Sequence, residues 1–162
     1  MQNAKDTFYI TLRNRLTTVN PERTMTLRGI VRPGILVEEA EAPMAQLPLD
    51  AFVLRWTKFA ADTELPSILA HLTCEIHYVT SGTQTNSGLD RGRALEEMDY
   101  ELLQILCPSS IVKVNYAQTP AGQMGTNVFW SPAVFATETR TRERAGRVAT
   151  VEVFAFQEEG EQ

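Results

Sequence analysis

The sequence predicts an α+β fold, with a mostly antiparallel sheet, two main helices packed on it and a long C-terminal β-hairpin. Two segments repeat apolar residues every three or four positions, as one face of a helix does, and others alternate apolar and polar residues, as half-buried strands do. The link between the two clearest strand segments is turn-rich and too short for the crossover that parallel strands need. The 162 residues, 43% of them hydrophobic, fit a single domain spanning residues 1–162.

The opening segment is expected to be a helix. Its apolar stripe consists of Phe8, Leu12, Leu16 and Val19. Asn20-Pro21 ends this helix, because the residue before a proline is disfavoured in the α region. Residues 31–34 (Val-Arg-Pro-Gly) then predict a turn, residues 35–39 a first strand at the sheet edge, and residues 42–48, with two prolines, a loop.

Two central strands follow. Residues 50–59 alternate Phe52, Leu54 and Trp56 with Val53, Arg55 and Thr57. Residues 70–78 alternate most regularly, with Cys74 among the core-facing side chains and His71, Glu75 and His77 on the other face. Residues 81–88 are polar and contain glycine, so we expect a loop that is mobile or that becomes ordered against a partner.

A second helix is expected after Asp90, which is a suitable N-cap residue. Its apolar stripe consists of Leu95, Met98, Leu102, Ile105 and Leu106. Cys107-Pro108 ends the helix. Glu96, Glu97 and Glu101 are expected to face water on the opposite side.

The C-terminal third predicts strands joined by turns. In order, we expect a short strand at residues 111–114, a loop at 119–125, and a hairpin with arms at 128–140 and 147–156. Ala145-Gly146 is expected at the tip of this hairpin. The acidic residues 157–162 offer no apolar side chain to bury, so we expect a frayed tail.

Charge and composition limit the classes of function. A formal charge of −5 disfavours a general nucleic-acid binder, because phosphate affinity comes from clustered Lys and Arg. No segment predicts a signal peptide or a membrane span. The two cysteines, Cys74 and Cys107, are too few and too distant for a disulfide framework, so a reducing cytosol is the expected compartment.

Neither a metal site, a cofactor nor an enzymatic activity is expected. His71 and His77 stand six residues apart, about 20 Å along an extended strand, and only Glu75 joins them as a third ligand type. The chain lacks a nucleophile elbow, a phosphate loop and a dinucleotide fingerprint. Paired catalytic carboxylates stay open as an alternative, because Asp and Glu are scattered along the chain and no pair stands out.

Arginines concentrate near the expected hairpin tip, at Arg140, Arg142, Arg144 and Arg147. They could bind nucleic acid, reach acidic groups on a neighbouring subunit, or simply keep an exposed strand soluble, which is the default interpretation. Between the two binding roles we favour the neighbouring subunit, because the chain is acidic and offers many carboxylates. These four arginines are therefore our candidates for an oligomer interface.

The tryptophans and Phe129 are expected to pack in the core or on the sheet. Because Phe129 and Trp130 are adjacent on an expected strand, they should point to opposite faces, and a partner is expected to cover the outer ring.

The order of these elements resembles the tail terminator family of long-tailed phages, which includes minor tail protein U of lambdoid phages. The resemblance spans Asp6 to Phe156 and concerns element order, length and long polar loops. It implies a homo-oligomeric, hexameric ring that caps the tail tube, contacts tail-tube and head-joining proteins, and belongs to a virion tail assembled in the bacterial cytoplasm. It also implies binding without chemistry, with no sequence-specific nucleic acid and no membrane.

Two other classes stay open. One is a small-ligand-binding or enzymatic α+β domain with a pocket between helix and sheet. The other is a different piece of a tail-like machine, such as a tube, head-joining or completion subunit, because element order does not separate related folds by role.

Overall fold

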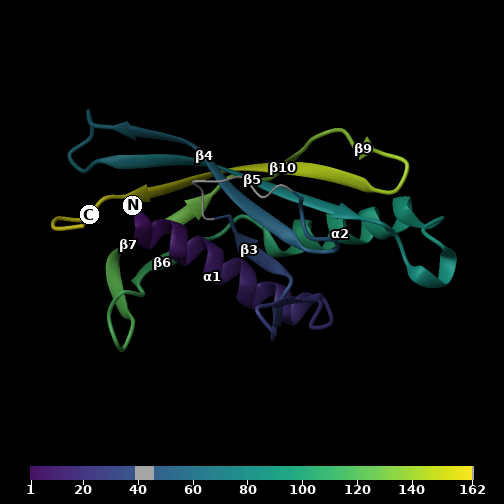
Figure 1. The fold of residues 1–162 in the computed structure, drawn as a ribbon. Coiled ribbons are helices and arrows are strands. Elements are labelled where there is room, and N and C mark those ends of the chain that lie inside the picture. The colour runs from purple at the N-terminus through teal and green to yellow at the C-terminus, as the bar shows by residue number, and fades with distance from the viewer. Residues whose placement is uncertain (39–45, 162) are drawn as a thin grey trace.

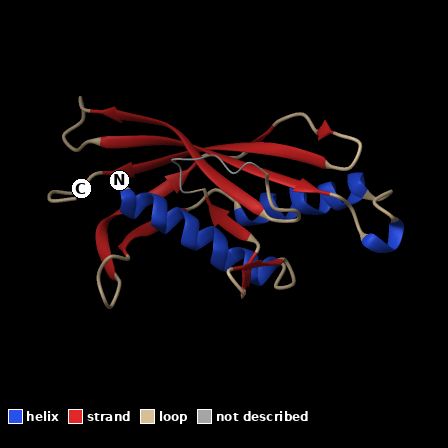
Figure 2. Cartoon of the chain, viewed as in Figure 1, coloured by secondary structure: helices blue, strands red, loops and turns tan. Residues whose placement is uncertain are grey.

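The computed structural model describes residues 1–38 and 46–161. The helices are α1 (Gln2–Val19), a short 3-10 helix (Gln84–Asn86) and α2 (Arg91–Ile105). The strands are β1 (Thr24–Leu27), β2 (Ile30–Pro33), β3 (Ile35–Val37), β4 (Phe52–Asp62), β5 (Leu69–Thr80), β6 (Ser110–Asn115), β7 (Gly122–Trp130), β8 (Val134–Phe135), β9 (Thr139–Arg140) and β10 (Ala145–Phe156). Two α-helices and a predominantly antiparallel sheet in this part of the chain confirm the predicted α+β class (Figure 2).

The main sheet has the strand order β3-β4-β5-β10-β7-β6. Strands β7, β8 and β9 pair in succession with β10, and every pair is antiparallel except β3 with β4. The predicted edge strand is β3, and the two central strands β5 and β10 pair along their whole length. Figure 1 shows both α-helices on one side of this sheet. The opposite side carries no helix within the described ranges.

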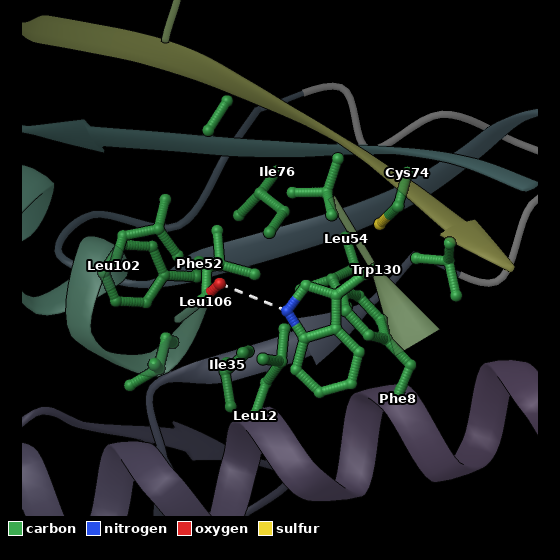
Figure 3. Close-up of a cluster of buried hydrophobic side chains, with 14 of the residues drawn as sticks. Phe8, Leu12, Ile35, Phe52, Leu54, Cys74, Ile76, Leu102, Leu106 and Trp130 are labelled. Carbon is green, nitrogen blue, oxygen red and sulfur yellow. Dashed lines mark hydrogen bonds between the residues drawn. The ribbon is translucent and has the colours of Figure 1, made fainter. Parts of the chain in front are cut away.

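The core lies between the sheet and the two helices (Figure 3). Phe8, Leu12 and Leu16 of α1 are fully buried, as the apolar stripe predicts. The ring of Phe8 meets Trp130 edge to face with 5.2 Å between centroids, and the Trp130 indole N–H donates to the Leu106 carbonyl at 3.1 Å. These contacts join α1, β7 and the end of α2. Burial of each large apolar side chain there contributes about 1.5–3 kcal/mol.

The predicted turn at residues 31–34 is wrong. Its first three residues belong to β2, which forms a two-stranded hairpin with β1. The turn lies instead at Arg28 and Gly29, which have φ of 51° and 78°. Two central residues with positive φ form the tight turn of a two-residue hairpin. An arginine rarely adopts positive φ, so the residues at this position did not indicate a turn.

The C-terminal hairpin forms, but its first arm is interrupted. The arm expected at residues 128–140 consists of the end of β7, then β8, then β9. Pro132, the second residue after β7, lacks the N–H that a continuous ladder needs. Ala145 and Gly146 lie inside β10, not at the tip, which is formed by residues 141–144. A Cβ on Gly146 would lie 2.6 Å from a methyl carbon of Val79, so the close strand pairing there requires glycine.

Other segment boundaries differ less. The short strand expected at residues 111–114 is β6, and the loop expected at 119–125 is shorter, because β7 begins at Gly122. Residues 46–48 lie in no helix or strand, as expected, while residues 39–45, which include the rest of that predicted loop and the last residue of the predicted first strand, lie outside the described residues.

The prediction that Glu101 faces water is wrong. Its side chain is buried against the link after α1, where it forms an ion pair with Arg23 and accepts a hydrogen bond from the Asn20 amide at 2.7 Å. Glu96 and Glu97 are exposed, as predicted. Glu101 therefore ties α2 to the end of α1, because a buried carboxylate needs a charged or hydrogen-bonding partner.

Asp90 precedes α2 as predicted but makes no side-chain cap to the helix. Its carboxylate accepts hydrogen bonds from the Thr83 amide at 2.9 Å and the Thr83 hydroxyl at 2.7 Å, and these bonds lower the pKa of Asp90 to about 2. The carboxylate therefore binds the preceding loop and does not cap the helix.

Strand β4 leaves part of one edge open. Strand β3 pairs with it only from Phe52 to Leu54, and no other strand of the described residues lies along that side of β4. A β-bulge between Trp56 and Lys58 shifts the register with β5 beyond this point. Because a bulge bends and twists its strand, the outer half of β4 forms an arm with the start of β5, and this arm projects at the upper left of Figure 1.

Candidate functional site

The four candidate interface arginines occupy different environments. Arg140 is exposed and forms an ion pair with Glu138, whose pKa is lowered by that hydrogen bond. Arg142 is exposed and has no ion-pair partner in the described part of the chain. Arg144 donates to the Leu47 carbonyl at 3.4 Å. Arg142 is thus placed to reach another molecule, whereas Arg140 and Arg144 already contact their own chain, Arg140 through its local pair with Glu138.

Arg147 is an internal contact between the sheet and α2. Its Nε lies 3.1 Å and 3.2 Å from the two carboxylate oxygens of Asp99, and its Nη1 donates to the Ala136 carbonyl at 2.8 Å. The Tyr78 hydroxyl also donates to Asp99, and burial, followed by this hydrogen bond, raises the pKa of Tyr78. Arg147 therefore contributes to attachment of α2, a role that its sequence position did not indicate.

The tail expected to fray is anchored from Gln157 to Glu161, while Gln162 lies outside the described residues. The Nζ of Lys113 on β6 lies 2.6 Å from a Glu161 oxygen and donates to the Phe156 carbonyl at 2.6 Å. The Thr126 hydroxyl and amide donate to Glu158 at 2.6 Å and 2.8 Å, and the hydroxyl's bond is the main cause of the lowered pKa of Glu158. These polar contacts attach the segment to β6 and β7, although it has no apolar side chain to bury.

The two histidines pair with different carboxylates. His71 pairs with Glu152, and His77 lies 2.9 Å from Glu75 on its own strand. Within residues 1–38 and 46–161, no three His, Cys, Asp or Glu side chains come together in a way that could hold a metal ion. His71 therefore contributes a contact between β5 and β10, whereas His77 contributes a contact along β5 itself, on the side of the sheet away from the helices.

Aromatic rings form a row on that same side of the sheet. The ring of Phe154 stacks on His71 with 4.7 Å between centroids and on Phe129 with 5.4 Å. Phe129 and Trp130 point to opposite faces of β7, as predicted, with Trp130 in the core. The row joins β5, β10 and β7, and its members are only partly buried.

Cys74 has the buried environment that its position in the strand pattern predicts. Cys74 lies in the core, and burial raises the pKa of its thiol. Cys107 is exposed just past Leu106, the C-cap residue of α2. The Cys74 thiol is thereby kept in its protonated, unreactive form.

Large apolar side chains are exposed on two projecting hairpins. On the β4–β5 arm these are Phe59, Leu65 and Ile68, and 59% of Phe59 is accessible. On the β1–β2 hairpin they are Leu27, Ile30 and Val31, and the latter two are 68% and 67% exposed. Clusters of exposed apolar residues mark interaction sites more often than single ones do, so both hairpins are candidate contact surfaces.

An open groove of about 1150 Å³ lies beside the β1–β2 hairpin and reaches the base of the β4–β5 arm. Its walls come from α1 between Gln2 and Arg13, the β1–β2 hairpin, β3 and the bulged part of β4. Five cationic side chains and two carboxylates line it, together with Tyr9 and Trp56. The groove is therefore basic and partly aromatic, although the whole chain has a formal charge of −5.

No family model matches the chain, and a search of curated proteins finds no relative. Among the helices of residues 1–38 and 46–161, none combines the length and the apolar character that a bilayer span needs.

Proposed function

We propose that this protein is a structural subunit of a phage tail or phage-tail-like assembly, a ring-forming tail terminator that caps the tail tube and joins it to the head. In that role it has copies of itself, tail-tube proteins and head-joining proteins as neighbours, and its place is a virion tail assembled in the bacterial cytoplasm. The work is binding, with no chemical step.

The observation that carries this proposal is the exposure of apolar side chains on arms that extend past the core. Phe59 on the β4–β5 arm and Ile30 on the β1–β2 hairpin each expose more than half of their surface. Burial of a Phe or Ile side chain contributes about 1.5–3 kcal/mol, so a partner that packs on these arms would stabilise the complex by burying surface that is exposed in the isolated chain.

The ionisable side chains also support a binding role. Lys113, Arg147 and Glu101 form ion pairs that join segments far apart in the chain, and they do not line the groove. These charges contribute to the rigidity of the subunit. A rigid subunit with projecting arms is suited to repeated contacts with its neighbours, because less conformational freedom is lost on assembly.

The test is the assembly state of the purified chain, alone and with the tail-tube protein encoded in the same genomic neighbourhood. Light scattering and negative-stain microscopy should show closed rings, or rings at the ends of tubes once tube protein is added. A particle that stays monomeric at high concentration and ignores tube protein would refute the proposal, and incorporation along the tube would identify a tube subunit.

A further inference from the structure

The basic groove carries more positive than negative charge, since five cationic side chains and only two carboxylates line it. Arg55 forms an ion pair with Glu38, but Lys5, Arg13 and Arg28 have no carboxylate partner among the described residues. Lys5 lies over the Trp56 ring at 5.5 Å and Arg13 over the Tyr9 ring at 5.9 Å, so the rings hold these cations at the groove wall. This surface attracts an acidic partner with apolar side chains.

The outer stripe of α2 has the complementary chemistry. It consists of Glu96, Glu97, Tyr100 and Leu103, all exposed, with Tyr100 64% accessible. Glu96, Tyr100 and Leu103 stand at positions i, i+4 and i+7 of the helix, the spacing with which a helix anchors itself in a groove. None of these residues lines the basic groove, so one subunit can use both surfaces at once.

We propose that the outer stripe of α2 in one copy of this chain docks into the basic groove of the next copy. This inference rests on the proposed ring-forming function and names its contact. Two different complementary surfaces on one chain give a head-to-tail interface, which closes into a ring when its rotation permits. Glu96 and Glu97 meet Lys5 and Arg13, while Tyr100 and Leu103 cover the apolar part of the groove.

Charge reversal on each side tests the contact. The groove variant is Lys5→Glu with Arg13→Glu, and the stripe variant is Glu96→Lys with Glu97→Lys. Sedimentation velocity over a concentration series should show that each variant alone associates at least about tenfold more weakly than the unaltered chain, because like charges then face each other. An equimolar mixture of the two variants should assemble again, because opposite charges then meet at every contact.

Recovery in the mixture separates the docking contact from misfolding, since two misfolded chains would not restore assembly. The control variant reverses two exposed carboxylates outside both surfaces, Glu22→Lys with Glu159→Lys, and should assemble as the unaltered chain does. Assembly by each variant alone, or no recovery in the mixture, overturns the docking contact while rings of the unaltered chain would still support the proposed function. Charge-dependent assembly into open chains would support the contact and refute the ring.

Discussion

Lys113 and Glu161 form a buried ion pair that fastens the C-terminal segment to β6, with 2.6 Å between Nζ and the carboxylate and 1% of each side chain exposed. The amino group of Met1 lies 3.6 Å from the same carboxylate, so both ends of the described chain meet at this point, as Figure 1 also shows. The pair holds together three segments that are distant in sequence.

Replacing Lys113 by Met should destabilise the protein by about 3 kcal/mol, because a buried carboxylate loses its main partner. The cost is at the lower end of the range for buried pairs, since the tail can open and expose Glu161 to water. Urea unfolding measures the change. Glu159→Gln, an exposed acid in the same tail, should stay within about 0.5 kcal/mol, and an equal loss there would show that the effect comes from overall charge.

The carboxylates of the C-terminal segment should make stability depend on pH. Burial opposes ionisation of Glu161, but hydrogen bonds and the charges of Lys113 and the N-terminus outweigh it and lower its pKa, and the pKa of Glu158 is also lowered. A folded-state pKa below the unfolded value of about 4.3 contributes stability that is present above that value and is lost as pH falls through the folded pKa. The Glu158→Gln, Glu161→Gln double variant should therefore lose less unfolding free energy than the unaltered chain when the pH is lowered from about 5 to about 3. Parallel curves in a pH series of urea titrations would contradict this.

Replacing Arg147 should lower the stability of the protein, whereas replacing Arg142 should affect its association alone. Arg147→Met leaves Asp99 with the Tyr78 hydroxyl alone and should cost about 2 kcal/mol of unfolding free energy. Arg142→Ala removes an exposed side chain and should change stability by less than about 0.5 kcal/mol. If Arg142 contacts a neighbouring subunit, its loss should still weaken association in sedimentation experiments. Equal effects of the two variants on thermal unfolding would contradict the different placements.

The exposed apolar residues of the β4–β5 arm should matter for assembly only. Phe59→Ser should leave the monomer's stability unchanged within about 0.5 kcal/mol, because the ring is mostly exposed. Its association should weaken by about tenfold or more, since 1.4 kcal/mol of lost burial already changes a dissociation constant tenfold. Val134→Ser is the matched control, an exposed apolar residue on β8 away from the arm. Unchanged association of Phe59→Ser would remove the arm from the interface.

Periodic patterns predicted the elements whose burial follows that periodicity. The stripe from Phe8 to Leu16 identified α1, and the alternation around Cys74 identified β5, because one face of each packs on the core. Trp130 also lies in the core as expected. In these segments, local pattern and tertiary packing agree.

The features that were missed depend on contacts between distant segments. Glu101 meets Arg23 across 78 positions, and Lys113 meets Glu161 across 48, so no local pattern identifies either pair. The basic groove draws its cations from α1, the turn between β1 and β2, and the two strands β2 and β4, which only the fold brings together. The arginines near residue 140 were visible as a cluster, but the separate role of Arg147 appears only once α2 lies against β10.

The bulge between Trp56 and Lys58 has a consequence for how many molecules can join. A long, flat strand edge would accept further strands one after another and lead towards fibrous aggregates. The local twist and the change of register interrupt that template within a few residues. The bulge thereby favours assemblies of limited size over unlimited sheet growth.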